Sequence, residues 1–159
     1  MAQGKRRVVA LVDVDTFPGS AWHYELMELA LTSAGAFAGE EGRHVRALHS
    51  LFARAPERAQ RAGLTLPDPG RVNSLIAAGA GACAILALFG GPAGYLVSRG
   101  GGGQYMASVV LPGAAEEVTA SGDSLALALI GALALALGQA DPAAGMLPEP
   151  YTTDRVTLN

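Results

Sequence analysis

The chain has 159 residues, of which half are hydrophobic and only 16% are charged, and its net charge is −3. This length suits one domain with a substantial core, and the apolar composition excludes a chain that is disordered throughout. Eleven Lys and Arg residues stand against fourteen Asp and Glu residues. This balance argues against general binding to nucleic acid, which requires an excess of positive charge.

The first predicted elements are a strand and a helix. Residues 7–14 are rich in Val, which favours a strand. Ser20 is a suitable cap for a helix that we expect over residues 21–34, with Trp22 and Leu26 on one side. A strand followed by an amphipathic helix is typical of the beginning of an α/β or α+β domain.

Residues 43–62 also have the periodicity of a helix, and Pro56 is expected to begin a second short helix within them. Five arginines of this segment fall within about 60° of one line on a helical wheel. They are Arg43, Arg46, Arg54, Arg58 and Arg61. Two interpretations stay open for this stripe: a solvated helix face, or a docking surface for an acidic protein partner.

Residues 72–98 form the longest uncharged stretch, and several glycines and Pro92 divide it. We expect a short helix followed by three strands in an antiparallel meander. The strands are predicted at 83–89, 95–99 and 104–111. The segment after them, PGAAEEVTASGD, is expected to be a surface loop.

Residues 124–138 alternate Leu and Ala, and both are strong helix formers, so we expect a helix capped by Ser121 or Asp123. A helix that is apolar on every side must be buried on every side. Because a domain of this size has little interior to surround it, we expect a homo-oligomer that forms through this helix.

Together these elements predict an α+β fold, a single domain over residues 1–138 with an antiparallel sheet packed by helices. The nearly all-apolar helix closes the domain. Residues 139–159 contain three prolines and are expected to form an extended or partly disordered tail.

Asp13 and Asp15 follow the apolar run of the first predicted strand, just before a Pro-Gly turn. A strand that ends in D-x-D before a turn resembles motif I of the haloacid-dehalogenase-like phosphotransferases. The stretch SGDSLALA, which contains Asp123, resembles the later acidic motif of that family. The resemblance implies Mg²⁺-dependent phosphoryl transfer, with Asp13 as the nucleophile and Asp15 as the general acid.

The chain departs from the family pattern at three points. Phe17 stands where the family has Thr or Val, Leu127 stands where a second acid is usual, and no lysine follows Lys5. The alternative is that both aspartates simply end a strand and form a turn. Since no set of catalytic residues is complete, we favour a non-enzymatic protein without a cofactor. Mg²⁺ would be required only under the phosphoryl-transfer hypothesis.

Arg99 stands next to four consecutive glycines. The backbone N–H groups of Gly101 and Gly102, together with the Arg99 guanidinium, could form an anion-binding nest. A flexible hairpin connection is the alternative interpretation. No metal site is predicted, because Cys83 is the only cysteine and the three histidines are poorly spaced. Cys83 is expected to be a buried, inert thiol.

The expected location is the cytoplasm, because the N-terminal apolar run Val8–Val12 is too short for a signal-peptide core. A membrane-associated protein is a further alternative, since residues 72–98 are long enough to span a bilayer. Residues 124–138 would rise only about 22 Å as a helix, less than the roughly 30 Å of the hydrocarbon core. The favoured function is therefore self-association or partner binding, ahead of phosphoryl transfer and membrane association.

Overall fold

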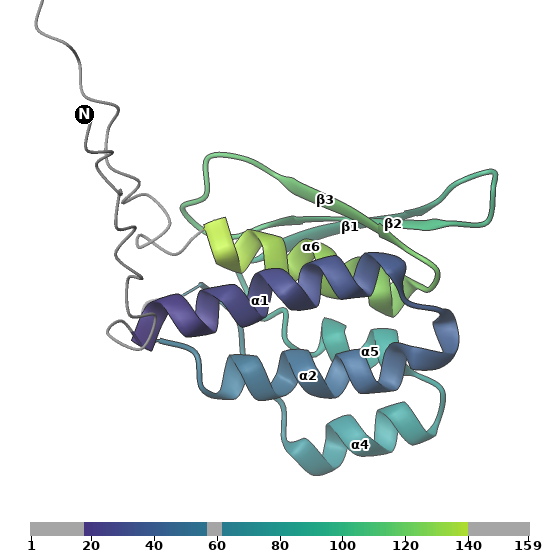
Figure 1. Cartoon of the computed structure of the whole chain (residues 1–159), viewed down its shortest axis with the longest axis horizontal. Helices are drawn as coiled ribbons and strands as arrows, with labels where there is room; N and C mark the ends of the chain where they lie inside the picture. Colours follow the sequence, from purple (N-terminus) through teal and green to yellow (C-terminus); the bar gives the residue numbers. More distant parts are fainter. Residues whose placement is uncertain (1–17, 57–61, 140–159) are drawn as a thin grey trace, which may run out of the picture.

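A computed structural model describes residues 18–56 and 62–139. Its elements in chain order are α1 (Pro18–Gly35), the 3₁₀ helix η2 (Ala38–Glu40), α2 (Glu41–Ala53), α4 (Pro69–Ala77), α5 (Gly81–Leu86), β1 (Gly94–Arg99), β2 (Tyr105–Val110), β3 (Val118–Gly122) and α6 (Leu125–Gln139). The strands form an antiparallel sheet in the order β1-β2-β3. The helices lie on one side of this sheet (Figure 1), which confirms the predicted single-domain α+β fold.

Helix α6 is the centre of the core, as its apolar sequence predicts. It packs against β2 and β3 on one side and against α1, α2 and α5 on the others, and Leu129 and Leu133 are fully buried. Small residues allow this close packing: a Cβ atom added at Gly131 would lie 3.1 Å from the Cβ of Ala120. A single chain therefore covers the helix on every side. The premise that one face of this helix would be left open is wrong, and self-association through residues 124–138 stays a prediction.

The amphipathic pattern of α1 is confirmed. Trp22 and Leu26 are buried, and the indole Nε1–H of Trp22 donates a hydrogen bond of 2.8 Å to the carbonyl of Leu51 in α2. The helix begins at Pro18 rather than at Ala21. Ser20 therefore lies within the first turn of the helix rather than before it.

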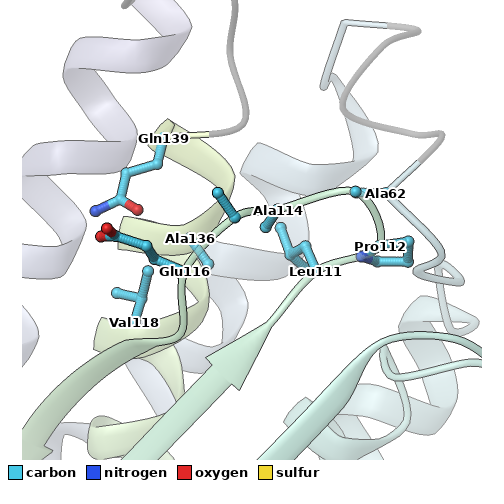
Figure 2. A pocket seen from close by; sticks show the side chains of 10 residues that line it. Ala62, Leu111, Pro112, Ala114, Glu116, Val118, Ala136 and Gln139 are labelled. Atoms are coloured by element: carbon cyan, nitrogen blue, oxygen red, sulfur yellow. The ribbon is translucent and has the colours of Figure 1, made fainter.

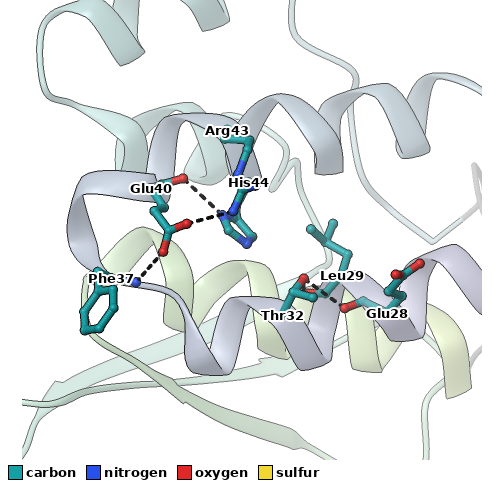
Figure 3. Close-up of polar contacts among 7 residues, drawn as sticks. All are labelled: Glu28, Leu29, Thr32, Phe37, Glu40, Arg43 and His44. Carbon is teal, nitrogen blue, oxygen red and sulfur yellow. Dashed lines mark hydrogen bonds and ion pairs between the residues drawn. The ribbon is translucent and has the colours of Figure 1, made fainter.

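A short polar network reverses the chain between α1 and α2 (Figure 3). The carboxylate of Glu40 accepts a hydrogen bond from the backbone N–H of Phe37 (3.0 Å) and from the guanidinium of Arg43 (2.8 Å). The carbonyl of Glu40 accepts a hydrogen bond from Nδ1 of the buried His44 (3.0 Å). These contacts fix the connection between the two helices to the first turns of α2.

Two elements differ from the sequence predictions. The predicted strand at 83–89 is wrong, because Gly81–Leu86 forms the helix α5, in agreement with the helix propensity of its alanines. Cys83 is exposed on this helix and is not a buried thiol. The segment expected to be a surface loop contains β3, a short strand that pairs with β2 along its length.

No helix within residues 18–56 and 62–139 is long and apolar enough to cross a membrane. The 72–98 stretch, which suggested a span, is divided among α4, α5 and β1. The predicted strand at 7–14, the helix that Pro56 was expected to begin, and most of the predicted tail at 139–159 lie outside the described residues. Gln139 itself is the last residue of α6.

The sheet has one packed face and one open face. Ala107 and Val109 of β2 are buried on the helix side, whereas Met106 and Val110 alternate with them and are exposed on the other side. Serine and threonine hydroxyls share the open face; Ser108 Oγ and Thr119 Oγ1 lie 2.7 Å apart across β2 and β3. The two sides of the sheet thus follow the period of two that a half-buried sheet requires.

Candidate functional site

The predicted catalytic residues Asp13 and Asp15 lie outside the described residues. Asp123, from the later acidic motif, stands between β3 and α6, and its Oδ2 accepts a 2.7 Å hydrogen bond from the backbone N–H of Ala38. The carboxylate therefore ties η2 to the end of the sheet. Neither Ser121 nor Asp123 caps α6: the backbone N–H of Leu127 donates to Ser124 Oγ (3.2 Å).

The described members of the arginine stripe contact side chains of their own chain. Arg43 pairs with Glu40, and Arg46 Nε donates to Asn73 Oδ1 (3.0 Å). Arg54 of α2 forms an ion pair with Glu25 of α1. These contacts support the helix layer, and docking of an acidic partner on this stripe stays a prediction. Arg58 and Arg61 lie outside the described residues.

The hydrogen bonds between Arg54 and Glu25 hold the pKa of the Glu25 carboxyl below its ordinary value and raise the pKa of Arg54. Partial desolvation opposes both shifts, and the attraction between the opposite charges adds to them. Both side chains are about half exposed. The pair is therefore a surface contact between two helices, and nothing in its geometry suits it to proton transfer.

The glycines after Arg99 form a hairpin turn between β1 and β2. Gly100 N–H donates to the carbonyl of Gln104 (2.8 Å), and Gly103 N–H donates to the carbonyl of Gly100 (3.0 Å). The Arg99 guanidinium lies over the ring of Tyr105, 5.3 Å from its centre. Gly102 lines a hollow that also contains Asp123, and this carboxylate would oppose a bound anion. Anion binding by Arg99, Gly101 and Gly102 stays a prediction.

A hollow that involves α6 lies where the helix ends near the loop before β3 (Figure 2). Its volume is about 490 Å³, and Glu116, which faces the Gln139 amide, is the ionisable side chain among the described residues that line it. One carboxylate and one amide do not form a nucleophile and base pair. The sequence did not predict this hollow, because its walls come from segments that are far apart in the chain.

Metal ligands do not gather in the described part of the chain, where no group of three His, Cys, Asp or Glu side chains could hold an ion. The buried His44 and the partly buried His49 are each hydrogen-bonded to a backbone carbonyl, of Glu40 and of Pro67 respectively. These histidines therefore stabilise loops and helix ends.

The most unusual surface is strand β1, which we call the β1 edge. Tyr95 and Val97 lie on the helix side of the strand and are 47% and 39% exposed. Leu96 lies on the opposite side and is 67% exposed. Because α6 packs against β2 and β3, β1 extends beyond the helix layer with apolar side chains on both sides.

The hydrogen-bond pattern shows which backbone groups of β1 face outward. Gly100 bonds with Gln104 at the turn, and bonding alternates along an antiparallel pair. Ser98, Leu96 and Gly94 therefore bond with β2. The N–H and C=O groups of the alternate residues Tyr95, Val97 and Arg99 point away from β2, and no described strand pairs with them.

Comparison of the chain with protein-family models, with curated protein sequences and with solved structures found no match.

Proposed function

We propose that this is a non-enzymatic protein of the cytoplasm that works through reversible self-association, and that two copies pair through the β1 edge. One observation carries the proposal: β1 exposes apolar side chains on both sides and a row of backbone groups without a partner among the described residues. An open edge of this kind is a template for another strand.

A second copy fits this edge because the strand is complementary to itself. In an antiparallel pair centred on Val97, Val97 lies opposite its counterpart and Tyr95 lies opposite Arg99 of the other copy. This register pairs each outward N–H and C=O group of Tyr95, Val97 and Arg99. It also separates the two positive charges, since each guanidinium meets an aromatic ring. Arg99 already lies over the Tyr105 ring within one chain.

The size of the surface sets the expected strength. Six residues of strand extend over only about 20 Å, so the pairing buries much less than the roughly 800 Å² per partner of a standard interface. A contact of this size gives a weak and reversible dimer. We expect a dissociation constant in the range of about 10–100 µM.

Sedimentation equilibrium over a wide concentration range tests the proposal. The apparent mass of the wild-type protein should rise from 16.1 kDa, the mass of the monomer, toward twice that value as the protein concentration increases. Val97→Pro should stay monomeric, because proline lacks the outward N–H at the centre of the pairing. The hairpin should survive this substitution, since the N–H of Val97 does not bond with β2.

Val97→Thr is the matched control, because it keeps both the N–H group and the β-branched side chain. It should associate like the wild type. A wild type that remains at 16.1 kDa at several hundred micromolar would contradict the proposal. Equal association of Val97→Pro and the wild type would also contradict it.

A further inference from the structure

Helix α1 has an apolar stripe that the described residues leave uncovered, and we call it the α1 stripe. Tyr24 is 69% exposed and Leu31 is 76% exposed. With the partly buried Met27 between them, they follow the i, i+3, i+7 spacing of one helix side. Glu28 borders the stripe. Large apolar side chains that gather on one side of a helix are normally covered by another element.

The α1 stripe lies next to the second open edge of the sheet. Among the strands, α1 packs chiefly against β3. The backbone N–H and C=O groups of Ser108 in β2 bond with β1, so they do not bond with the backbone of Thr119 opposite. By the same alternation, the N–H and C=O groups of Thr119 and Ser121 point away from β2, toward an edge that no described strand occupies.

We propose that residues 7–14 add to this edge of β3 as a fourth, antiparallel strand, and that their apolar side covers the α1 stripe. The residue pattern fits both requirements. Val8, Ala10, Val12 and Val14 lie along one side, and Arg7, Val9, Leu11 and Asp13 lie along the other. The first side is apolar throughout and suits burial, whereas the second has a charged residue at each end.

The short connection between the proposed strand and α1, and the direction in which this strand would run, also agree with the proposal. Asp123, just after β3, bonds with Ala38, just after α1, so β3 and α1 end at the same place, and Figure 1 shows both elements running toward it. A strand that enters α1 through residues 15–17 must then run opposite to β3. Such a connection has the usual length between a strand and a helix.

The lengths match as well. From residue 14 back to residue 8, a strand covers about 20 Å at 3.4 Å per residue. From residue 18 to residue 31, a helix covers about 20 Å at 1.5 Å per residue. The strand therefore reaches from the beginning of α1 to Leu31 and covers the whole α1 stripe.

Residue-resolved amide hydrogen exchange on the full chain tests this proposal. Thr119 and Ser121 should exchange more slowly than unpaired amides by a factor of about 100 or more. Their exchange should not depend on protein concentration, because the covering strand belongs to the same chain. Exchange at Thr119 and Ser121 as fast as in an unpaired edge would overturn the proposal. Protection that appears only at high concentration would assign this edge to a second copy and would also overturn it.

Two variants identify the covering segment. Val12→Asp places a carboxylate on the side that faces the α1 stripe, and it should release the Thr119 and Ser121 amides. Leu11→Asp places the same charge on the opposite side and should leave them protected. Protection that survives Val12→Asp would show that another segment covers the edge, and it would contradict the proposal.

If Val12→Asp unfolds the protein, amide exchange will become faster throughout α6. A third variant, Leu31→Lys, is then used. Leu31→Lys changes a residue that is 76% exposed, so the described part of the molecule tolerates it. It should still release the Thr119 and Ser121 amides, because lysine disrupts the cover of the α1 stripe. Unchanged protection in Leu31→Lys would contradict the proposal. The β1 edge has its own concentration-dependent test, so either proposal can fail without the other.

Discussion

At the scale of single residues, the ion pair between Glu25 and Arg54 links α1 to α2 through two hydrogen bonds. These bonds lower the pKa of Glu25 in the folded protein. A lowered pKa means that the stabilisation is fully present above the unfolded value, which is 4.5 for a glutamate. It is then lost as the pH falls through the folded value. Because the pair is about half exposed, it contributes less than about 1 kcal/mol.

The first prediction follows from the lowered pKa of Glu25. Glu25→Gln should lower the free energy of unfolding slightly at pH 7, by less than about 1 kcal/mol, and the difference should shrink as the pH falls below 4.5 and through the lowered pKa of Glu25. Urea unfolding at pH 7 and at an acid pH below 4.5 measures the difference. Glu28→Gln, on the same helix, is the control and should change stability little at either pH. A loss for Glu25→Gln that is equal at both pH values would show that the ion pair is not its cause.

The second prediction concerns Asp13 and Asp15. If they only end a strand and form a turn, exchange of either residue to Asn should cost no more than about 1 kcal/mol. Added Mg²⁺ should leave the melting temperature unchanged, because an ion that does not bind the native state cannot stabilise it. Thermal melts with and without Mg²⁺ measure both effects. A Mg²⁺-dependent rise that disappears in Asp13→Asn would instead support the phosphoryl-transfer alternative.

At the scale of elements, β3 and α6 touch so closely that the contact requires glycine. A Cβ atom at Gly122 would lie 2.7 Å from the backbone nitrogen of Ala128 and 2.9 Å from Cβ of Leu127. The helix backbone cannot move aside without disturbing the core. Gly122→Ala should therefore destabilise the protein by about 1–3 kcal/mol. Gly101→Ala is the control, because no atom lies within 4 Å of a Cβ added at Gly101. The free energy of unfolding, measured with urea, should change by less than about 0.5 kcal/mol in this variant.

Helix α6 gives a second prediction at this scale. Leu129 is fully buried within one chain, so Leu129→Ala should cost about 2–5 kcal/mol through the cavity that it leaves. The loss in the free energy of unfolding should be the same at low and high protein concentration. A loss that changes with concentration would place α6 in an interface between copies, against the burial seen here.

Long segments with a clear pattern could be predicted from the sequence, and short ones could not. The pattern of Trp22 and Leu26 predicted α1, and the Leu and Ala of α6 predicted a buried helix. In α5 and β3, only five or six residues leave too little periodicity to separate helix, strand and loop. Tertiary contacts decide there: β3 is a strand because β2 lies beside it.

The β1 edge could not be predicted at all, because exposure depends on where the helices pack. The residues Tyr95 to Val97 look like those of an ordinary half-buried strand. Their exposure on both sides results from α6, which covers β2 and β3 and stops short of β1. Likewise, nothing in the sequence near Asp123 indicated that its carboxylate would bond with Ala38.

At the scale of the whole molecule, the described sheet has helices on one side and an open edge at each end. The two proposals assign different occupants to these edges. A second copy pairs with β1, and residues 7–14 pair with β3. Together they would convert three strands per chain into a continuous sheet across two chains, whose remaining edges belong to the added N-terminal strands.

Amide hydrogen exchange at the β1 edge tests the central claim most directly, because the pairing protects alternate residues. Between about 10 µM and about 1 mM, exchange at Tyr95, Val97 and Arg99 should slow by about four- to sevenfold as the dimer forms, as expected for a dissociation constant of about 10–100 µM. Leu96 and Ser98, which bond with β2, should be protected at both concentrations. Equal and rapid exchange at Tyr95, Val97 and Arg99 throughout this range would contradict self-association through β1.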